Sequence, residues 1–534
     1  KPFVNEFTFR KFLEQGKESE FDELFDTAVA KVRSEVLGKT FPMYIDGKEA
    51  YSDMQLLETS PIDGSIIGSF QKGSRDDAKR AIEAAASRFP EWAAMHYAER
   101  VRIFRKAASI LSRDKFIIAA AMSIENGKTR YESVGEVDEA IDFINYYAGE
   151  MERNKGYVRK TRLEASGKQV GAGFQGAPGR EERVTILMKP YGVFGVIAPF
   201  NFPVSISTGM SVGALITGNT VVFKPSSTDN MTMLTGLMLY NVFAEAGVPP
   251  GAFNYITGPG SELGDELATS PKVSGIVFTG SRKTGMGMVR KSFDEDKQKV
   301  FVVEMGGKDP VIVSKYADLG IAAQGVASAA FGYAGQKCSA CSRVYVHESI
   351  KEEFISELVD RVQKLKIGDP LIKENYIGPL ISQAALQRYI SAVEEVKREG
   401  RLVYGGNSIK GLYVEPVVAE IDQNSRLMHE ELFLPFLTID TYRDFDSAMQ
   451  KANDTPYGLT AGLYSKKRSE MKQFLDKIEA GVVYVNRETS ATTGAIVGLH
   501  TFVGWKGSGL TGKGTGSRFY LEQFMREQSQ SLVK

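Results

Sequence analysis

Short apolar runs alternate with helix-length stretches over most of this chain of 534 residues. In its first half such runs stand at 193–198, 220–223, 253–256 and 274–278, with helices predicted at 204–216 and 231–246. A second series runs from Val300 to Val485, with strands predicted at 300–303, 310–313 and 344–346 and helices at 320–334, 350–365 and 383–398. Strands that are apolar on both faces and separated by helices form parallel sheets of βαβ units. The sequence therefore predicts an α/β fold of two lobes, with a ligand cleft at the carboxyl ends of the strands.

Length and charge balance narrow the class of protein. A chain of 534 residues exceeds what one hydrophobic core supports, so two or three lobes are expected. The 66 Lys and Arg residues equal the 66 Asp and Glu residues, so no long-range field favours nucleic acid or an anionic membrane. No segment approaches the roughly 18 consecutive apolar residues of a membrane span, and the first residues carry no apolar core of a secretion signal. We expect a cytoplasmic protein with a small-molecule ligand.

One thiol and one distant carboxylate are the main candidates for chemistry. Cys338 stands between Lys337 and Ser339, and Glu304 ends an apolar run earlier in the chain. A cysteine taken alone is more often a small buried hydrophobe than a nucleophile. Lys337 and the small residues near Cys338 would give a thiolate the positive potential and the access that it needs. The pair supplies a nucleophile and a proton acceptor, which indicates covalent catalysis on a carbonyl.

Cys338 and Cys341 form a C-x-x-C motif, which is also typical of zinc sites and of dithiol redox sites. Zinc would need two further ligands, and the four histidines form no pair with ligand spacing. No metal is therefore expected. A disulfide between two cysteines so close in sequence is unfavourable, which fits a reducing compartment. Cys341 is expected to be a packing residue that can also trap an oxidised Cys338.

Two glycine-rich stretches differ in their context. Residues 507–512 match G-x-G-x-x-G, but no strand leads into them and no apolar helix follows, so no phosphate site is expected there. Residues 279–285 follow a predicted strand and open a helix whose first N–H groups favour a pyrophosphate. Lys224 and Ser227 end another strand, where a dinucleotide-binding sheet often has an acid for the ribose hydroxyls. An ordinary strand-to-loop turn is the alternative there.

Two further segments stand outside the α/β pattern. Residues 5–37 predict an amphipathic helix that packs through Phe21, Leu24, Phe25, Ala28 and Val32. Residues 155–183 are rich in glycine and charge with few apolar anchors, which fits either disorder or a two-stranded flap that pairs with a neighbouring subunit.

Six motifs, taken in order, resemble those of the aldehyde dehydrogenase superfamily. They are Pro199-Phe200-Asn201-Phe202-Pro203, Lys224-Pro225-Ser226, Phe278-Thr279-Gly280-Ser281, Glu304-Met305-Gly306-Gly307-Lys308, Gly335-Gln336-Lys337-Cys338 and Glu430-Glu431-Leu432-Phe433. The resemblance runs from about residue 41 to 512 and implies a Rossmann-type cofactor lobe and a catalytic lobe. It implies an N-terminal helical cap (1–40), a dinucleotide-binding domain (41–154 and 184–300), a catalytic domain (301–512) and an oligomerisation flap with a C-terminal segment (155–183 and 513–534).

The resemblance also implies roles for the motif residues. Cys338 would attack an aldehyde carbon, and the side-chain amide of Asn201 with the Cys338 backbone N–H would hold the developing oxyanion. Glu304 would activate the water that hydrolyses the thioester. Lys224 would contact the adenine ribose of NAD(P), Ser281 the pyrophosphate, and Glu431 with Phe433 the nicotinamide ribose. The other residues expected at the cofactor are Ala198, Pro199, Phe200, Ser226, Ser227, Gly258, Thr279, Gly280, Gly285 and Gly306.

Within the superfamily the chain is similar to the glutamate-γ-semialdehyde dehydrogenases. The loop at 493–498 looks like their anchor for the substrate's α-carboxylate, which would bind the backbone at Gly494 and Ala495 and the hydroxyl of Ser339. Phe202 and Phe502 would form the aromatic walls of the aldehyde pocket, and Glu139 and Lys337 also match substrate-binding positions. Another carboxylated aldehyde, such as succinate semialdehyde, is the rival substrate. A catalytically silent binding protein of this fold would lack Cys338 or Glu304, and both are present.

One departure from the family concerns the cofactor. Ser227 stands where many members have Glu, and removal of that acid leaves room for a 2′-phosphate, so we expect NADP⁺ to be accepted. The flap and the C-terminal stretch imply a homo-oligomer, either a dimer or a hexamer, that exchanges strands between subunits.

Overall fold

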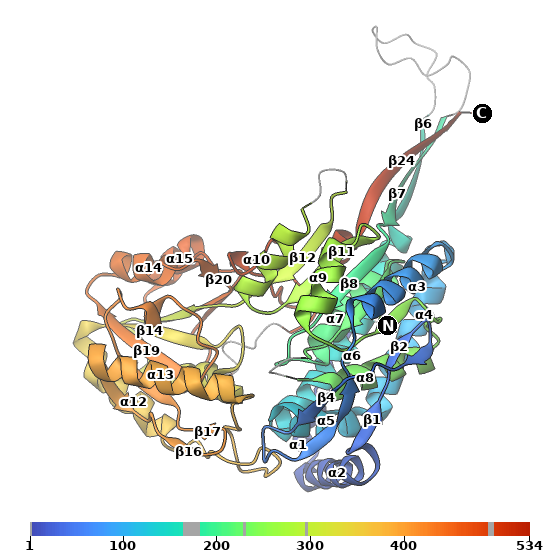
Figure 1. Cartoon of the computed structure of the whole chain (residues 1–534). Helices are drawn as coiled ribbons and strands as arrows, with labels where there is room; N and C mark the ends of the chain where they lie inside the picture. Colours follow the sequence, from blue (N-terminus) through green and yellow to red (C-terminus); the bar gives the residue numbers. More distant parts are fainter. Residues whose placement is uncertain (1–2, 164–181, 228–230, 294–296, 490–495, 534) are drawn as a thin grey trace, which may run out of the picture.

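The computed structural model describes residues 3–163, 182–227, 231–293, 297–489 and 496–533. Two seven-stranded sheets form the two lobes, and Figure 1 shows them side by side, with residues of the second lobe in yellow and orange. The predicted α/β fold with two lobes is confirmed.

The first sheet has the order β12-β11-β8-β9-β10-β2-β3, in which the five strands from β12 to β10 are parallel. Its strands are β12 (Val300–Glu304), β11 (Val273–Thr279), β8 (Val193–Ile197), β9 (Thr220–Lys224), β10 (Phe253–Tyr255), β2 (Met43–Ile45) and β3 (Lys48–Ala50). The helices of this lobe include α3 (Arg75–Ala94), α4 (Tyr97–Arg113), α5 (Lys115–Asn126), α6 (Arg130–Arg153), α7 (Ser205–Ile216), α8 (Met233–Ala246), α9 (Asp265–Thr269) and α10 (Arg282–Lys291). A small sheet of β1 (Lys39–Phe41), β5 (Ile66–Gln71) and β4 (Gln55–Thr59) lies beside them.

The second sheet has the order β15-β18-β19-β14-β13-β21-β22, and only its edge strand β15 is antiparallel. Its strands are β15 (Arg401–Tyr404), β18 (Val417–Glu420), β19 (Phe436–Tyr442), β14 (Cys341–His347), β13 (Asp309–Val313), β21 (Thr460–Tyr464) and β22 (Val482–Val485). Its helices are α11 (Leu319–Phe331), α12 (Lys351–Val362), α13 (Gln383–Glu399), α14 (Phe445–Asn453) and α15 (Arg468–Lys477).

One strand belongs to a different lobe from the one that the sequence predicted. Residues 300–303 were assigned to the second series, but β12 pairs in parallel with β11 at the edge of the first sheet. The apolar run correctly predicts a strand. The strand that it pairs with depends on the crossover from β11 through α10, and the run carries no information about that crossover.

The N-terminal segment folds as two α-helices followed by a π-helical turn. α1 (Thr8–Glu14) and α2 (Glu18–Lys31) lead into a turn at Val32–Val36. Phe21 and Phe25 are fully buried, and the ring of Phe21 stacks on Tyr131 of α6. Leu24 is 41% exposed, so its predicted packing role is wrong. The segment packs on α5 and α6, so it covers the first lobe.

Three antiparallel strands form an arm that extends away from both lobes in Figure 1. They are β6 (Val158–Leu163), β7 (Glu182–Pro190) and β24 (Met525–Val533), with β7 in the middle. The expected two-stranded flap is thus joined by the C-terminal strand of the same chain. Its role in oligomers and the boundaries of the four predicted domains stay predictions.

No helix in the described part of the chain is long and apolar enough to cross a membrane. The cytoplasmic location stays a prediction.

Candidate active site

Two adjoining cavities meet at Cys338. The larger, of about 1140 Å³, lies between the lobes, and the smaller, of about 90 Å³, is a chamber with mostly apolar walls. Cys338, Thr279 and Met305 line both. A reactive sulfur at this position can meet one ligand in each cavity.

The larger cavity follows the carboxyl edge of the first sheet. β8 leads into Ala198, β9 ends at Lys224, and β11 ends at Thr279, immediately before the N-terminus of α10. Ser281 caps this helix, because its Oγ accepts a hydrogen bond from the N–H of Thr284 at 3.3 Å. A helix start at this edge of a parallel sheet suits a pyrophosphate, so the cavity fits a dinucleotide.

Most of the residues predicted at the cofactor line this cavity. They are Ala198, Pro199, Phe200, Lys224, Ser226, Ser227, Thr279, Gly280, Ser281, Gly306, Glu431 and Phe433. Gly258 and Gly285 do not line it. Gly258 packs against the backbone of Gly73, and Gly285 packs against Met305, so both support the wall from behind.

Lys224 and Ser227 lie close together at the end of β9. The Lys224 ammonium and the Ser227 hydroxyl both donate to the carbonyl of Pro225, at 3.3 and 2.9 Å. Burial lowers the pKa of Lys224 to about 8. The carboxylate of Asp265, which also lines the cavity, is already paired with Lys291 at 2.7 Å.

The second lobe closes the other side of the cavity. Glu431 accepts a hydrogen bond from the N–H of Gly307 at 2.9 Å, and burial raises its pKa to about 7. Phe433 has a left-handed backbone, with φ 60°, and its ring packs edge-to-face with the ring of Phe200, with the ring centres 5.7 Å apart. Arg388 of α13 also lines the cavity, and the sequence analysis missed it because no motif marks a single Arg on a predicted helix.

The nucleophile loop carries backbone strain. Tyr333 and Ala334, just before it, have positive φ angles of 51° and 52°. Gly335 has φ 66°, and an added Cβ would lie 2.2 Å from the carbonyl oxygen of Leu434. Such conformations persist where the surroundings enforce them, and they are frequent at functional sites.

Burial raises the pKa of the Cys338 thiol well above its usual range, and the carboxyl groups of Asp309, Glu431 and Glu304 act in the same direction. The ammonium of Lys337 is paired with Glu132 at 2.6 Å, which reduces the positive potential expected from it. Lys337 lines neither cavity. Its contribution to the thiolate stays a prediction.

Glu304 and Asn201 lie on different sides of the thiol. Glu304 lines the small chamber and accepts a hydrogen bond from the N–H of Gly504 at 3.0 Å, and burial raises its pKa to about 8. Asn201 lines the larger cavity, and its amide donates to the carbonyl of Gln336 at 3.2 Å. The amide has a second N–H, which is the group that an oxyanion would need.

The small chamber contains four of the predicted substrate-binding residues, namely Glu139, Phe202, Ser339 and Phe502. Burial raises the pKa of Glu139 to about 7. The chamber also contains Phe143, Ile206, Met210 and Val497, which the sequence analysis missed because they read as ordinary core residues. Gly494 and Ala495 lie outside the described residues.

Cys341 lies behind the site rather than in it. It is 2% exposed, stands in β14, and its thiol donates weakly to the carbonyl of Arg343 at 3.7 Å. Both cysteines are free thiols. Within the described ranges, no group of three or more His, Cys, Asp or Glu side chains could hold a metal ion.

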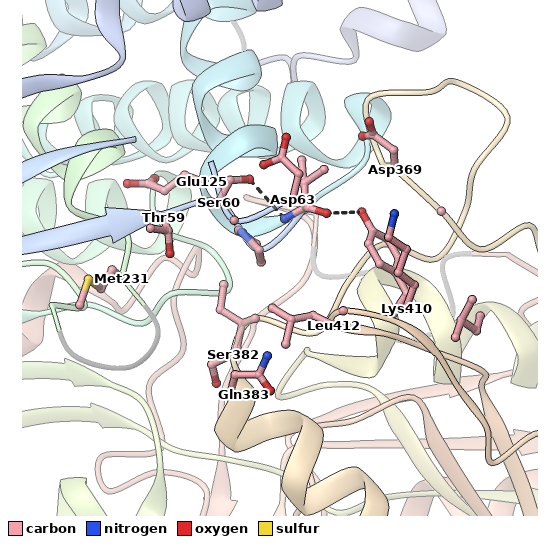
Figure 2. A pocket seen from close by; sticks show the side chains of 18 of the residues that line it. Thr59, Ser60, Asp63, Glu125, Met231, Asp369, Ser382, Gln383, Lys410 and Leu412 are labelled. Atoms are coloured by element: carbon pink, nitrogen blue, oxygen red, sulfur yellow. Dashed lines mark hydrogen bonds between the residues drawn. The ribbon is translucent and has the colours of Figure 1, made fainter. Parts of the chain in front are cut away.

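A separate cavity of about 840 Å³ also lies between the lobes (Figure 2). Its walls include Ser60, Asp63 and Glu125 of the first lobe and Gln383 and Lys410 of the second. The hydroxyl of Tyr413 donates to the carbonyl of Ile62 at 3.1 Å across the gap. None of the residues predicted for the site line it, so we do not assign the chemistry to it.

The comparisons with known proteins agree with this geometry. Residues 49–529 match the profile of the Aldehyde dehydrogenase family, so the chain belongs to that family and is an NAD(P)-dependent enzyme. Curated relatives include 1-pyrroline-5-carboxylate dehydrogenase of Geobacillus sp. (strain WCH70), 36% identical over 93% of this chain and 94% of the relative. Another is 1-pyrroline-5-carboxylate dehydrogenase 2 of Bacillus subtilis (strain 168), 37% identical over 92% and 93%. A solved structure of 1-pyrroline-5-carboxylate dehydrogenase from Thermus with bound NAD has a TM-score of 0.89 and 34% identity, and the match covers 100% of this chain and 99% of that chain.

Iodoacetamide should modify Cys338 and leave Cys341 unmodified in the native protein, because only Cys338 faces the cavities. Since the Cys338 pKa is raised, the thiol stays protonated at neutral pH, and the rate should keep rising up to pH 10 or beyond. Peptide mass spectrometry at several pH values measures both effects. The Cys338→Ala variant is the control, and a rate that levels off near pH 8 would contradict the raised pKa.

Proposed function

We propose that this enzyme oxidises L-glutamate γ-semialdehyde to L-glutamate with NAD(P)⁺, as a step of proline catabolism. The observation that carries the proposal is the position of Cys338 at the junction of a dinucleotide-sized cavity and a small chamber that contains Glu304. The similarity to 1-pyrroline-5-carboxylate dehydrogenases over nearly the whole chain supports the choice of substrate.

The residues of the chain divide the reaction into two halves. The Cys338 thiol releases its proton to solvent as its sulfur attacks the aldehyde carbon, and the resulting oxyanion is held by the second N–H of the Asn201 amide and by the Cys338 backbone N–H. A nicotinamide cofactor in the larger cavity would supply the hydride acceptor for the oxidation to the thioester. Glu304 then takes a proton from the water that attacks the thioester, which releases glutamate and restores the thiol.

Residues from both lobes would hold the cofactor. Ser281 and the first N–H groups of α10 would bind the pyrophosphate, and Lys224 would contact the ribose next to the adenine. Glu431 and Phe433 would contact the nicotinamide ribose from the second lobe.

The small chamber suits a short carbon chain with charged ends. Phe202 and Phe502 enclose the methylene groups, and the Ser339 hydroxyl donates to a carboxylate. The carboxyl of Glu139, with its pKa near 7, is placed to accept from an ammonium group at neutral pH. Gly494 and Ala495 remain the predicted backbone anchor for the α-carboxylate.

A panel of aldehydes tests the proposed substrate. With glutamate γ-semialdehyde, kcat/KM should exceed that for succinate semialdehyde and for a simple aliphatic aldehyde by at least about 10-fold, since unpaired buried polar groups penalise analogues that lack the matching group. Reduction of the cofactor at 340 nm gives the rates. The Cys338→Ala variant should have no turnover, and a better rate with the aliphatic aldehyde would reject the assignment.

Ser227 supports acceptance of NADP⁺ as well as NAD⁺. No carboxylate occupies this position to repel a 2′-phosphate. The Ser227→Glu variant should lower kcat/KM for NADP⁺ by about 10- to 100-fold through charge repulsion and desolvation, with a smaller effect for NAD⁺. Ser227→Ala is the matched control and should keep both activities within a few-fold. A hundredfold preference of the unaltered enzyme for NAD⁺ would contradict the proposal that it accepts NADP⁺.

The three-stranded arm supports a homo-oligomer, either a dimer or a hexamer. Both outer strands, β6 and β24, present edges that a second chain can pair with. Exposed apolar side chains along the arm include Val158, Ile186 and Leu532, at 38%, 37% and 56% exposure. Light scattering over a range of protein concentrations should show no monomer, and a monomer at micromolar concentration would contradict the proposal.

A further inference from the structure

A short turn between α5 and α6 contacts the segment that carries Asn201. α5 ends at Asn126, and α6 begins at Arg130, so residues 127–129 span a tight connection between two long helices. The amide of Asn126 donates to the carbonyl of Phe200 at 3.2 Å. The backbone immediately before Asn201 is thus tied to this turn.

The same turn buries a positive charge under an aromatic ring. Lys128 is fully buried, and its ammonium lies 3.5 Å from the centre of the Phe202 ring. A desolvated ammonium over a ring face is attracted by the quadrupole of the ring. Phe202, immediately after Asn201, is therefore held from the opposite side of the chamber wall.

The charge of Lys128 is balanced by Glu136 of α6, and neither side chain reaches solvent. One oxygen of Glu136 accepts hydrogen bonds from the N–H groups of Val204 and Ser205, at 2.8 and 3.1 Å. These N–H groups lie at the start of α7, where they have no partner within the helix. Glu136 thus fixes the end of the segment whose beginning is tied to Asn126.

These residues also contact the nucleophile loop. The hydroxyl of Tyr333 donates to the carbonyl of Asn126 at 2.7 Å, and the Lys128 ammonium lies 5.1 Å from the centre of the Tyr333 ring. One turn before Glu136, Glu132 is paired with Lys337, the residue before Cys338. The start of α6 therefore contacts both parts of the site, the Asn201 segment and the Cys338 loop.

We propose that Asn126, Lys128 and Glu136 are positioning residues that hold the Asn201 amide at a fixed place relative to Cys338. They act through residues 200–205 and touch neither substrate nor cofactor. The inference rests on the proposed role of Asn201 as an oxyanion donor.

The test neutralises the buried pair in one step, with Lys128→Met and Glu136→Gln together. Both replacements keep the approximate volume, the glutamine oxygen can still accept from α7, and no unpaired charge is left buried. We expect kcat/KM for glutamate γ-semialdehyde to fall by about 10- to 100-fold, as small displacements of catalytic groups do. Alkylation of Cys338 by iodoacetamide needs no oxyanion donor, so its rate should change less than about 2-fold.

A double-mutant cycle with Asn201→Ala separates positioning from general damage. If the Lys128 and Glu136 pair acts through Asn201, replacement of the pair in an Asn201→Ala background should lower kcat/KM by less than about 3-fold further. A full additional loss in that background would overturn the inference and leave the role of Asn201 intact. Unchanged turnover in Asn201→Ala alone would overturn that role and the inference with it.

Lys115 and Asp138 give a matched control, because this ion pair is also buried and also holds α6, in this case to α5. Its contacts are with Thr8 in the N-terminal segment, not with residues 200–205. Lys115→Met with Asp138→Asn should keep kcat/KM within a few-fold, and an equal loss there would show a merely structural effect. If the Lys128 and Glu136 variant does not fold, Asn126→Ala carries the same cycle, with an expected loss of about 3- to 10-fold.

Discussion

The site depends on the contact of the two lobes at the nucleophile loop. Cys338 can face two cavities only if its loop enters the gap between the sheets. Gly307 allows this approach, because an added Cβ would lie 2.3 Å from the carbonyl oxygen of Cys338. The left-handed backbone at Tyr333 and Ala334 marks where the chain leaves α11 and enters this loop. A close backbone contact on one side and local strain on the other thus determine where the sulfur lies.

Desolvation is the main electrostatic influence on the reacting groups. Burial raises the pKa of Glu304 to about 8 and those of Glu431 and Glu139 to about 7. These carboxyl groups therefore gain and lose protons near neutral pH, the range in which a general base is most effective. The same desolvation keeps the thiol of Cys338 protonated, since Lys337 is paired with Glu132. Burial therefore brings the pKa of the base, Glu304, close to neutral pH. The Cys338 thiol, in contrast, needs either a neighbouring group that takes its proton or a nearby positive charge that lowers its pKa.

Local sequence signals gave the elements of the fold and most of the residues in the cavities. Apolar runs located the strands, and motifs identified Cys338, Glu304 and Asn201. Glu304 and Asn201 lie at the carboxyl edge of the first sheet, at the end of β12 and after β8, whereas Cys338 stands in the loop between α11 and β14 of the second lobe. What the signals could not give was the partner of each element. The strand at 300–303 was real but assigned to the wrong sheet, and Lys337 was expected to act on Cys338 although its charge is paired with a helix 205 positions away in the chain.

Lys128 shows the same limit and also why a buried charge is useful at this place. A lysine in a turn between helices reads as a solvent-exposed residue, and nothing in its neighbourhood marks it as buried. An ion pair inside the protein gains little stability over an apolar pair of equal volume, because desolvation offsets the attraction. An apolar pair, however, could not accept hydrogen bonds from the two N–H groups at the start of α7. Nor could it place a positive charge over the Phe202 ring. The Lys128 and Glu136 pair is therefore better explained by the geometry that it imposes on residues 200–205 than by its contribution to the free energy of folding.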